Sequence, residues 1–261
     1  MHNSEIRVAL SKLNPISLDA IGSVKLMNRI EKKYVFTSGK LNDLINLLNG
    51  RYHVLEIDNL RVLPYSTTYF DTCDYLFYYQ HVRGEFDRYK IRYRKYEATD
   101  TSFLEIKKKT NKGRTIKWRI ENKPSAVYFD KQAVSFIEEH LPVDSTLVKP
   151  VLVNHFTRAT LVGFEPKERI TIDFNITFSD PEKKIQVEMP YLAIVELKKE
   201  GYSEYSDFKN LIRQLNIYPT GFSKYCMGSA ILNDSLKKNM IKPKLLLLNK
   251  IKNEHTWDSC N

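Results

Sequence analysis

Apolar and charged residues alternate at every second position along much of the chain. In residues 88–97, for example, Tyr89 and Ile91 alternate with Lys90 and Arg92. A period of two is that of a β-strand, whose side chains point to opposite faces in turn. β-Branched and aromatic residues, which favour strands, are frequent in these segments. The pattern predicts strands at about residues 26–36, 64–71, 88–97, 102–109, 114–122, 151–162, 168–178 and 191–199.

Other segments carry apolar residues three and four positions apart, which is the period of a helix. In residues 38–49, Leu41, Leu44 and Leu48 share one helical face, and Ser38 is expected to cap the helix at its start. Further helices are predicted at residues 131–141, 206–215 and 224 to about 238.

No linker rich in Pro, Gly or Ser divides these elements, so we expect one large domain. Long strands with short connections predict an α+β fold, in which an antiparallel eight-stranded β-barrel is decorated by helices. The expected division is an N-terminal lead-in (residues 1–25), the barrel domain (26–240) and a C-terminal tail (241–261) whose end frays.

Cations dominate one face of the predicted strands. In residues 88–97, Arg88, Lys90, Arg92 and Arg94 share a face, and apolar residues occupy the other. The same parity holds in the other strands, where neutral polar residues are scarce beside the charges. The cations on these faces are Arg29, Lys33, Lys90, Arg92, Arg94, Lys107, Lys117, Arg119, Arg158, Arg169 and Lys198.

Two interpretations of the charged faces compete. A solvated face explains any single strand, but it does not explain cations on most of them. If the sheet closes, the charged face becomes the inside of the barrel, where cations are costly unless an anion neutralises them. The second interpretation predicts a polyanionic ligand. The acids on the same faces, such as Glu31, Glu105 and Glu196, would then orient lysines or bind a divalent metal.

Composition narrows the class of protein. The 261 residues include 41 Lys and Arg against 31 Asp and Glu, a formal net charge of +10. Their 16 Tyr and 13 Phe exclude a disordered chain. No apolar run approaches the ~20 residues of a membrane span, and the N-terminus lacks a signal-peptide layout. Three cysteines are too few for a disulfide framework or a zinc site, which favours a reducing, cytoplasmic location.

Short motifs follow one another in a fixed order along these strands. The first are Arg29-x-Glu31-x-Lys33-Tyr34, TTYFDT ending at Thr72, and Lys90-x-Arg92-x-Arg94. FLEIKKK, Arg158, ERITID, IVELK and FSKY follow over residues 103–225. In this order the chain resembles the VTC domain, the polyphosphate polymerase branch of the triphosphate tunnel metalloenzymes, which is related to the CYTH proteins. The resemblance covers roughly residues 26 to 230.

This resemblance implies a basic tunnel that transfers the γ-phosphate of ATP to a growing polyphosphate chain and releases ADP, with Mn²⁺ or Mg²⁺. Phosphoryl transfer needs alignment and charge neutralisation more than covalent help from the protein. The implied catalytic residues are Lys33, Arg92, Arg94, Lys107, Arg158, Arg169 and Glu196. The implied substrate-binding residues are Arg29, Lys90, Lys117, Arg119, Lys198 and Lys224, and the implied metal ligands are Glu196 and Glu31.

Two positions depart from the family pattern. Arg29 stands where the CYTH branch has an acid, which argues against a plain triphosphatase. Gly221 stands where the family can carry a second lysine, three residues before Lys224, so one phosphate contact is expected to be lost. The resemblance also implies a stand-alone form without the membrane anchor of the eukaryotic relatives. A membrane partner and the oligomeric state stay open.

Other functions remain in competition. A metal-dependent triphosphatase or polyphosphatase, and a polyphosphate-binding module without turnover, would use the same cations. An RNA-binding β-protein would expose aromatic residues between basic ones. Tyr89 and Tyr93 instead fall on the face opposite Arg92, which favours a protein that binds no nucleic acid.

Overall fold

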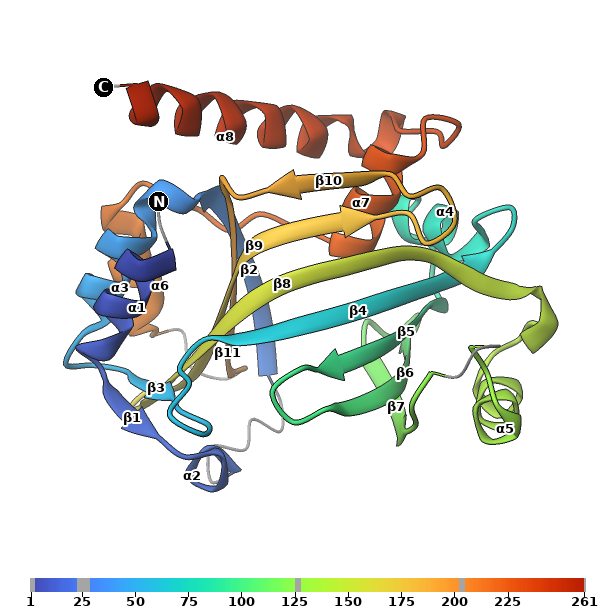
Figure 1. Cartoon of the computed structure of the whole chain (residues 1–261), viewed down its shortest axis with the longest axis horizontal. Coiled ribbons are helices and arrows are strands. Elements are labelled where there is room, and N and C mark those ends of the chain that lie inside the picture. The colour runs from blue at the N-terminus through green and yellow to red at the C-terminus, as the bar shows by residue number, and fades with distance from the viewer. Residues whose placement is uncertain (1–2, 23–28, 125–127, 202–204, 261) are drawn as a thin grey trace.

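One large twisted sheet forms the centre of the molecule, and helices pack around it (Figure 1). The structure is a computed structural model that describes residues 3–22, 29–124, 128–201 and 205–260. Its α+β class agrees with the prediction. Eight strands hydrogen-bond in the order β2-β11-β9-β8-β4-β5-β6-β7. They are β2 (Arg29–Thr37), β4 (Leu63–Thr72), β5 (Arg88–Tyr96), β6 (Thr101–Lys109), β7 (Thr115–Glu121), β8 (Val148–Phe164), β9 (Lys167–Ser179) and β11 (Leu192–Glu200), all of which were predicted.

The predicted closed barrel is wrong, because the sheet is open. β2 and β7 stand at the two ends of the strand order, and no ladder joins them in the part of the chain described. The outer edge of β2 pairs instead with the segment before α7 (Lys224–Leu232): Tyr34 bridges Pro219, and the amide of Thr220 donates to the carbonyl of Lys33 over 2.6 Å. A covered edge cannot accept another strand at these residues.

Three short strands were not predicted. β1 (Asn14–Ile16) pairs in parallel with β3 (His53–Leu55), β3 pairs with β8, and β10 (Gln186–Met189) pairs with β9. At three or four residues each, they are too short for alternation to be read from the sequence. The sheet therefore has eleven strands.

The predicted helices are present. They are α3 (Leu41–Leu48), α5 (Lys131–His140), α6 (Asp207–Gln214) and α7. The predicted cap at Ser38 is wrong: Thr37 caps a 3₁₀ turn over Ser38–Lys40 that precedes α3, and Ser38 donates to the carbonyl of Pro190. Elements that were not predicted are α1 (Asn3–Ser11), α2 (Leu18–Gly22), α4 (Leu76–Val82), short 3₁₀ turns at Ser145–Leu147 and Asn239–Ile241, and α8 (Lys242–Cys260).

The C-terminal segment folds as the long helix α8, which packs against β2 and β11 at one side of the molecule (Figure 1). Leu248 and Ile251 are buried against the core, so this segment packs on the domain. The predicted fraying concerned the end of the segment, where residue 261 and the side chains of residues 257–260 lie outside the described residues. Among the described residues, no helix has the length and apolar character needed to cross a membrane.

The apolar faces of the strands form the outer core. Ile170, Ile172 and Val195 pack against α3 and α6 in one cluster, and Tyr93 and Ile106 pack with α5 in another. Tyr89 is buried in the second cluster as well, so the parity inferred from the sequence is confirmed. With the apolar faces covered, the charged faces of the same strands line the inside of the curved sheet.

Candidate functional site

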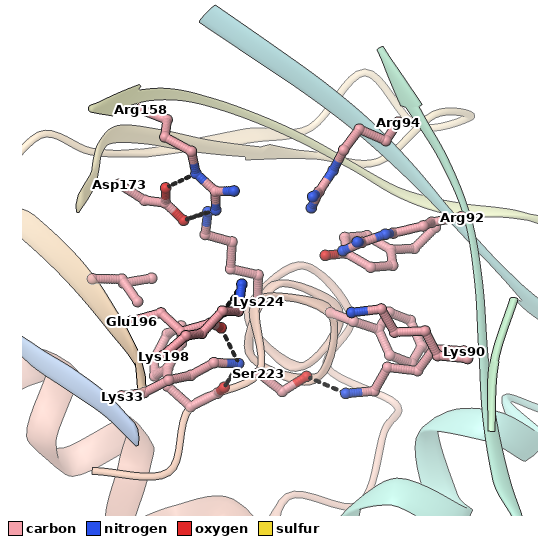
Figure 2. Close-up of a pocket in the computed structure, with 15 residues that line it drawn as sticks. Lys33, Lys90, Arg92, Arg94, Arg158, Asp173, Glu196, Lys198, Ser223 and Lys224 are labelled. Carbon is pink, nitrogen blue, oxygen red and sulfur yellow. Dashed lines mark hydrogen bonds and ion pairs between the residues drawn. The ribbon is translucent and has the colours of Figure 1, made fainter. Parts of the chain in front are cut away.

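A cavity of about 170 Å³ lies inside the curve of the sheet, and charged side chains point into it from both sides (Figure 2). Strands β2, β5, β6, β8, β9 and β11 and the start of α7 supply them. The lining contains eight cations against two carboxylates, a formal excess of six of the chain's ten surplus positive charges. The cations are Lys33, Lys90, Arg92, Arg94, Lys107, Arg158, Lys198 and Lys224, and the carboxylates are Asp173 and Glu196.

Asp173 holds two of the cations in place. Its carboxylate accepts two hydrogen bonds from Arg158, from Nε over 2.5 Å and from an Nη over 2.8 Å, and a third from Lys224 over 2.5 Å. Although burial opposes its ionisation, Arg158 and Lys224 hold the pKa of Asp173 well below its usual range. Asp173 therefore stays ionised and acts as an orienting group.

Glu196 occupies a similar position beside Lys33 and Lys198. Its oxygens lie 2.6 Å from the Nζ of Lys198 and 3.5 Å from the Nζ of Lys33. Burial is again outweighed, chiefly by Lys198 and Lys33, and the pKa of Glu196 is well below its usual range. The side chain keeps 21% of its surface exposed, against 6% for Asp173, so Glu196 is the more accessible carboxylate.

Glu105 lies behind the lining and supports it. This carboxylate is only 1% exposed; it accepts hydrogen bonds from Arg92 at 2.7 Å and from Lys117. The ion pair with Glu105 therefore holds the guanidinium of Arg92 in place. Breaking such a buried pair by removing one member typically costs 3–5 kcal/mol.

Arg94 and Lys107 differ from the paired cations, because neither has a carboxylate within ion-pair distance among the described residues. The Nε of Arg94 is buried without a hydrogen-bond partner in the part of the chain described. Arg92, burial and Arg94 lower the pKa of Lys107 to about 6. These two residues are the cations that most need an anionic partner.

Lys90 and Lys224 also have lowered pKa values. Burial lowers the pKa of each to about 7, and for Lys224 this is the net result although Asp173 opposes it. The Nζ of Lys90 donates to the hydroxyl of Ser223 over 3.2 Å (Figure 2). The free cavity therefore holds more cationic groups than it can keep charged near neutral pH.

The start of α7 brings residues from a distant part of the chain to the cavity. Ser223 caps this helix by accepting from the amide of Cys226, and Lys224 is the first helical residue. The Nζ of Lys33 donates to the carbonyl of Phe222 over 3.1 Å, which ties β2 to the same segment. Ser223 and Tyr69, which also lines the cavity, belong to the FSKY and TTYFDT motifs but were not predicted as site residues, because neither carries a charge.

Lys244 of α8 is a third residue that sequence reasoning missed. Its Nζ lies 3.9 Å from the position that a Cβ would take at Gly221. It also contributes to a strong lowering of the pKa of His81, after burial, Lys90 and Arg88. A cation from the C-terminal helix thus lies beside the position where a lysine was expected to be missing.

Several predicted site residues lie outside the cavity lining. Arg169 donates to the carbonyl of Ile21 over 3.3 Å, and Arg119 is exposed with its guanidinium 4.8 Å from the ring centroid of Phe103. Glu31 is exposed on β2, opposite Lys198 in the strand register. Lys117 does not line the cavity; it pairs with Glu105, which also pairs with Arg92 of the lining. The side chain of Arg29 is outside the described residues.

The donor set suits a metal ion that arrives with its substrate. Among the described residues, no three His, Cys, Asp or Glu side chains come together as a ready-made metal site. Mg²⁺ and Mn²⁺ accept one or two carboxylates together with phosphate oxygens and water. Glu196 is the carboxylate that fits this arrangement, because it is the more exposed of the two that line the cavity.

Solved structures of similar fold share little sequence with this chain. A candidate adenylate cyclase from Vibrio parahaemolyticus is 13% identical (TM-score 0.46; 78% of this chain, 99% of that one). Another from Bacillus halodurans is 17% identical (TM-score 0.45; 75% and 94%). A candidate adenylyl cyclase from Hippeastrum, described as having a dominant triphosphatase activity, is 15% identical (TM-score 0.49; 78% and 97%). No curated protein matches the chain.

The family comparison covers most of the molecule. The model of the VTC domain matches residues 28–233, which span every strand of the eight-strand path and α7. The motifs that suggested this family lie on β2, β4, β5, β6, β8, β9, β11 and α7, and most of their cations point into the cavity. The chain belongs to the VTC domain family.

Proposed function

We propose that this chain is an ATP-dependent polyphosphate polymerase. The observation that carries the proposal is the cavity, with eight cations against two carboxylates and with Arg94 and Lys107 lacking any carboxylate partner in the described chain. A triphosphate supplies about four negative charges at neighbouring positions, which suits this cluster. Arginine grips phosphate oxygens in pairs and lysine acts as a point charge.

The proposed reaction joins an oxygen of the polyphosphate chain end to the γ-phosphorus of ATP. The bond between that phosphorus and the β–γ bridging oxygen breaks, and ADP leaves with the electron pair. Arg92, Arg94 and Lys107 would neutralise the charge on the transferred group, and Arg158 and Lys224 would align the phosphates. A divalent metal, when bound at Glu196, supplies further charge neutralisation between the phosphates.

The low basicity of the two cavity carboxylates favours a phosphate oxygen over water as the acceptor of the phosphoryl group. Asp173 and Glu196 are each paired with two cations, and their lowered pKa values make both poor general bases. Hydrolysis assisted by either carboxylate would require that carboxylate to take a proton from water. The oxygen at a polyphosphate end is already ionised and needs no such proton transfer, so transfer to the chain end is the reaction that this cavity suits better.

The test is incubation of the purified chain with ATP and Mn²⁺ or Mg²⁺, followed by separate measurement of ADP, orthophosphate and acid-labile polymer. The proposal predicts long polyphosphate and ADP in amounts that match the phosphate incorporated. Orthophosphate equal to the ATP consumed would instead indicate a triphosphatase. Tight binding of polyphosphate without consumption of ATP would indicate a binding module. An Arg94→Met variant controls for contaminating activities, since it should lose the product.

A further inference from the structure

A second, smaller pocket lies on the opposite face of β2 from the cavity. Its lining consists of Lys32 and Tyr34 from β2, Lys209 and Arg213 from α6, and Ile217 and Pro219 from the segment that follows. Lys32 and Tyr34 face outward because their neighbour Lys33 faces the cavity. The pocket volume is about 60 Å³. This is several times the ~10–15 Å³ that a cavity needs to hold one water, which leaves room for a small polar group such as a phosphate.

Three cations meet at this pocket, and its lining contains no carboxylate. Lys209 and Arg213 are four residues apart on α6, so they project from the same helical face. Lys32 joins them from the neighbouring strand. In the part of the chain described, none of the three is in an ion pair. Burial, Lys199 and Lys32 lower the pKa of Lys209, as expected where cations are crowded together.

A buried carboxylate behind the pocket is engaged through one of its two oxygens. Glu168 is fully buried and accepts hydrogen bonds from the hydroxyl of Tyr52 and, over 3.3 Å, from the amide of Phe208. It is not part of the lining. From behind the lining it acts electrostatically on Tyr34 and Lys209, and its second oxygen, Oε1, has no hydrogen-bond partner in the described chain. No carboxylate of the described chain forms an ion pair with the three cations.

The unpartnered hydroxyl of Tyr34 is a second observation, separate from the cations, that points to a ligand. The residue is only 1% exposed, and its ring packs edge-on against Phe208 at 5.3 Å. Its hydroxyl is buried and makes no hydrogen bond within the described chain. Buried hydroxyl groups normally have a partner. Burial raises the pKa of Tyr34 to about 12, so the hydroxyl remains a donor near neutral pH.

We propose that this pocket binds a phosphate group, with the Tyr34 hydroxyl donating a hydrogen bond and Lys32, Lys209 and Arg213 neutralising its charge. The group is either inorganic phosphate or the terminal phosphate of a polyphosphate. This site is separate from the cavity and stands whether or not the chain synthesises polyphosphate.

The pocket and the cavity share a structural link. The segment that lines the pocket with Ile217 and Pro219 continues to Ser223 and Lys224 in the cavity. Between them, the amide of Thr220 donates to the carbonyl of Lys33. Occupation of the pocket would hold this segment against β2, and with it the start of α7.

The test is calorimetric titration of the full chain with inorganic phosphate and, in a parallel arm, with tripolyphosphate. Tyr34→Phe removes only the hydroxyl, and Lys209→Met removes one cation at nearly equal length. Each substitution should weaken anion binding at the pocket about tenfold, which corresponds to about 1.4 kcal/mol. Binding at the cavity should stay unchanged. Tyr218→Phe, which alters an exposed hydroxyl in the same segment, should bind like the wild type. Arg94→Met should weaken binding at the cavity alone.

Melting temperature without phosphate separates binding from folding. Since the Tyr34 hydroxyl has no partner to lose in the described chain, Tyr34→Phe should melt at the same temperature as the wild type or higher. A weakened site for inorganic phosphate identifies the free ion as the ligand, and an effect in the tripolyphosphate arm alone identifies a chain end. Wild-type binding of both anions by Tyr34→Phe and Lys209→Met would overturn the proposal.

Discussion

Binding of a triphosphate in the cavity should be accompanied by uptake of protons from solution. In the free chain the pKa of Lys107 is about 6, and those of Lys90 and Lys224 are about 7. A bound polyanion favours the charged form of each lysine and returns its pKa toward the ordinary value of ~10.4. The change in pKa therefore couples affinity to pH.

The size of the effect follows from these values. At pH 8 the three lysines together carry about 0.2 protons in the free chain and about 3 in the complex, so binding takes up as many as about 2.8 protons. At pH 6 they already carry about 2.3, and the uptake falls to about 0.7. Because protons are bound together with the ligand, affinity must fall as pH rises from 6 to 8.

The assay is titration calorimetry with tripolyphosphate, without metal, in buffers of different ionisation enthalpy at pH 6 and pH 8. Lys107→Met should take up about one proton fewer at pH 8, because it removes the group with the lowest pKa. Lys108→Met is the matched control, since Lys108 is the next residue along the strand, faces away from the cavity and pairs with Asp87. Proton uptake near zero in the wild type at pH 8, or equal uptake by the wild type and Lys107→Met, would refute the reasoning.

Other changes test separate parts of the structure. Arg94→Met should weaken triphosphate binding tenfold or more with little loss of stability, because it breaks no ion pair in the described chain; unaltered affinity by calorimetry would place Arg94 outside the binding site. Glu196→Gln should abolish turnover while ATP still binds, as measured by parallel binding and product assays, and a normal polymer yield would remove Glu196 from the mechanism. Lys244→Ala should lower triphosphate affinity by a few fold relative to Lys250→Ala, an exposed change on the same helix, and equal affinities would show that Lys244 does not reach the ligand. Gly228→Ala should lower the free energy of unfolding by about 1–3 kcal/mol in denaturant melts, because the new Cβ would approach Phe178 to 2.6 Å and Leu152 to 2.7 Å; a wild-type midpoint would mean that α7 shifts away from the sheet at little cost.

Strand parity accounts for much of what the sequence could predict. Alternation is a local property, so residues 88–96 showed on their own that Arg92 and Arg94 share a face opposite Tyr93. Long strands and amphipathic helices were found for the same reason. Most of the predicted cations therefore meet in one cavity, as expected from a shared face on a curved sheet.

Tertiary contacts account for what the sequence could not predict. Whether the sheet closes depends on the edge of β2, which pairs with Pro219 and Thr220 far along the chain. α8 has no strong helical periodicity of its own, so its place beside β2, and that of Lys244 near Gly221, had no local signal. The unpartnered hydroxyl of Tyr34 is likewise a property of its surroundings and not of its sequence position.

The most direct test of the central claim, that the cavity cations hold the phosphates of the substrate, is a crystal structure of the chain with a non-hydrolysable ATP analogue and Mn²⁺. The expected result places the triphosphate within hydrogen-bond distance of Arg94 and Lys107, with the metal between Glu196 and phosphate oxygens. A triphosphate bound outside the cavity, or one that leaves Arg94 and Lys107 without contact, would contradict the account.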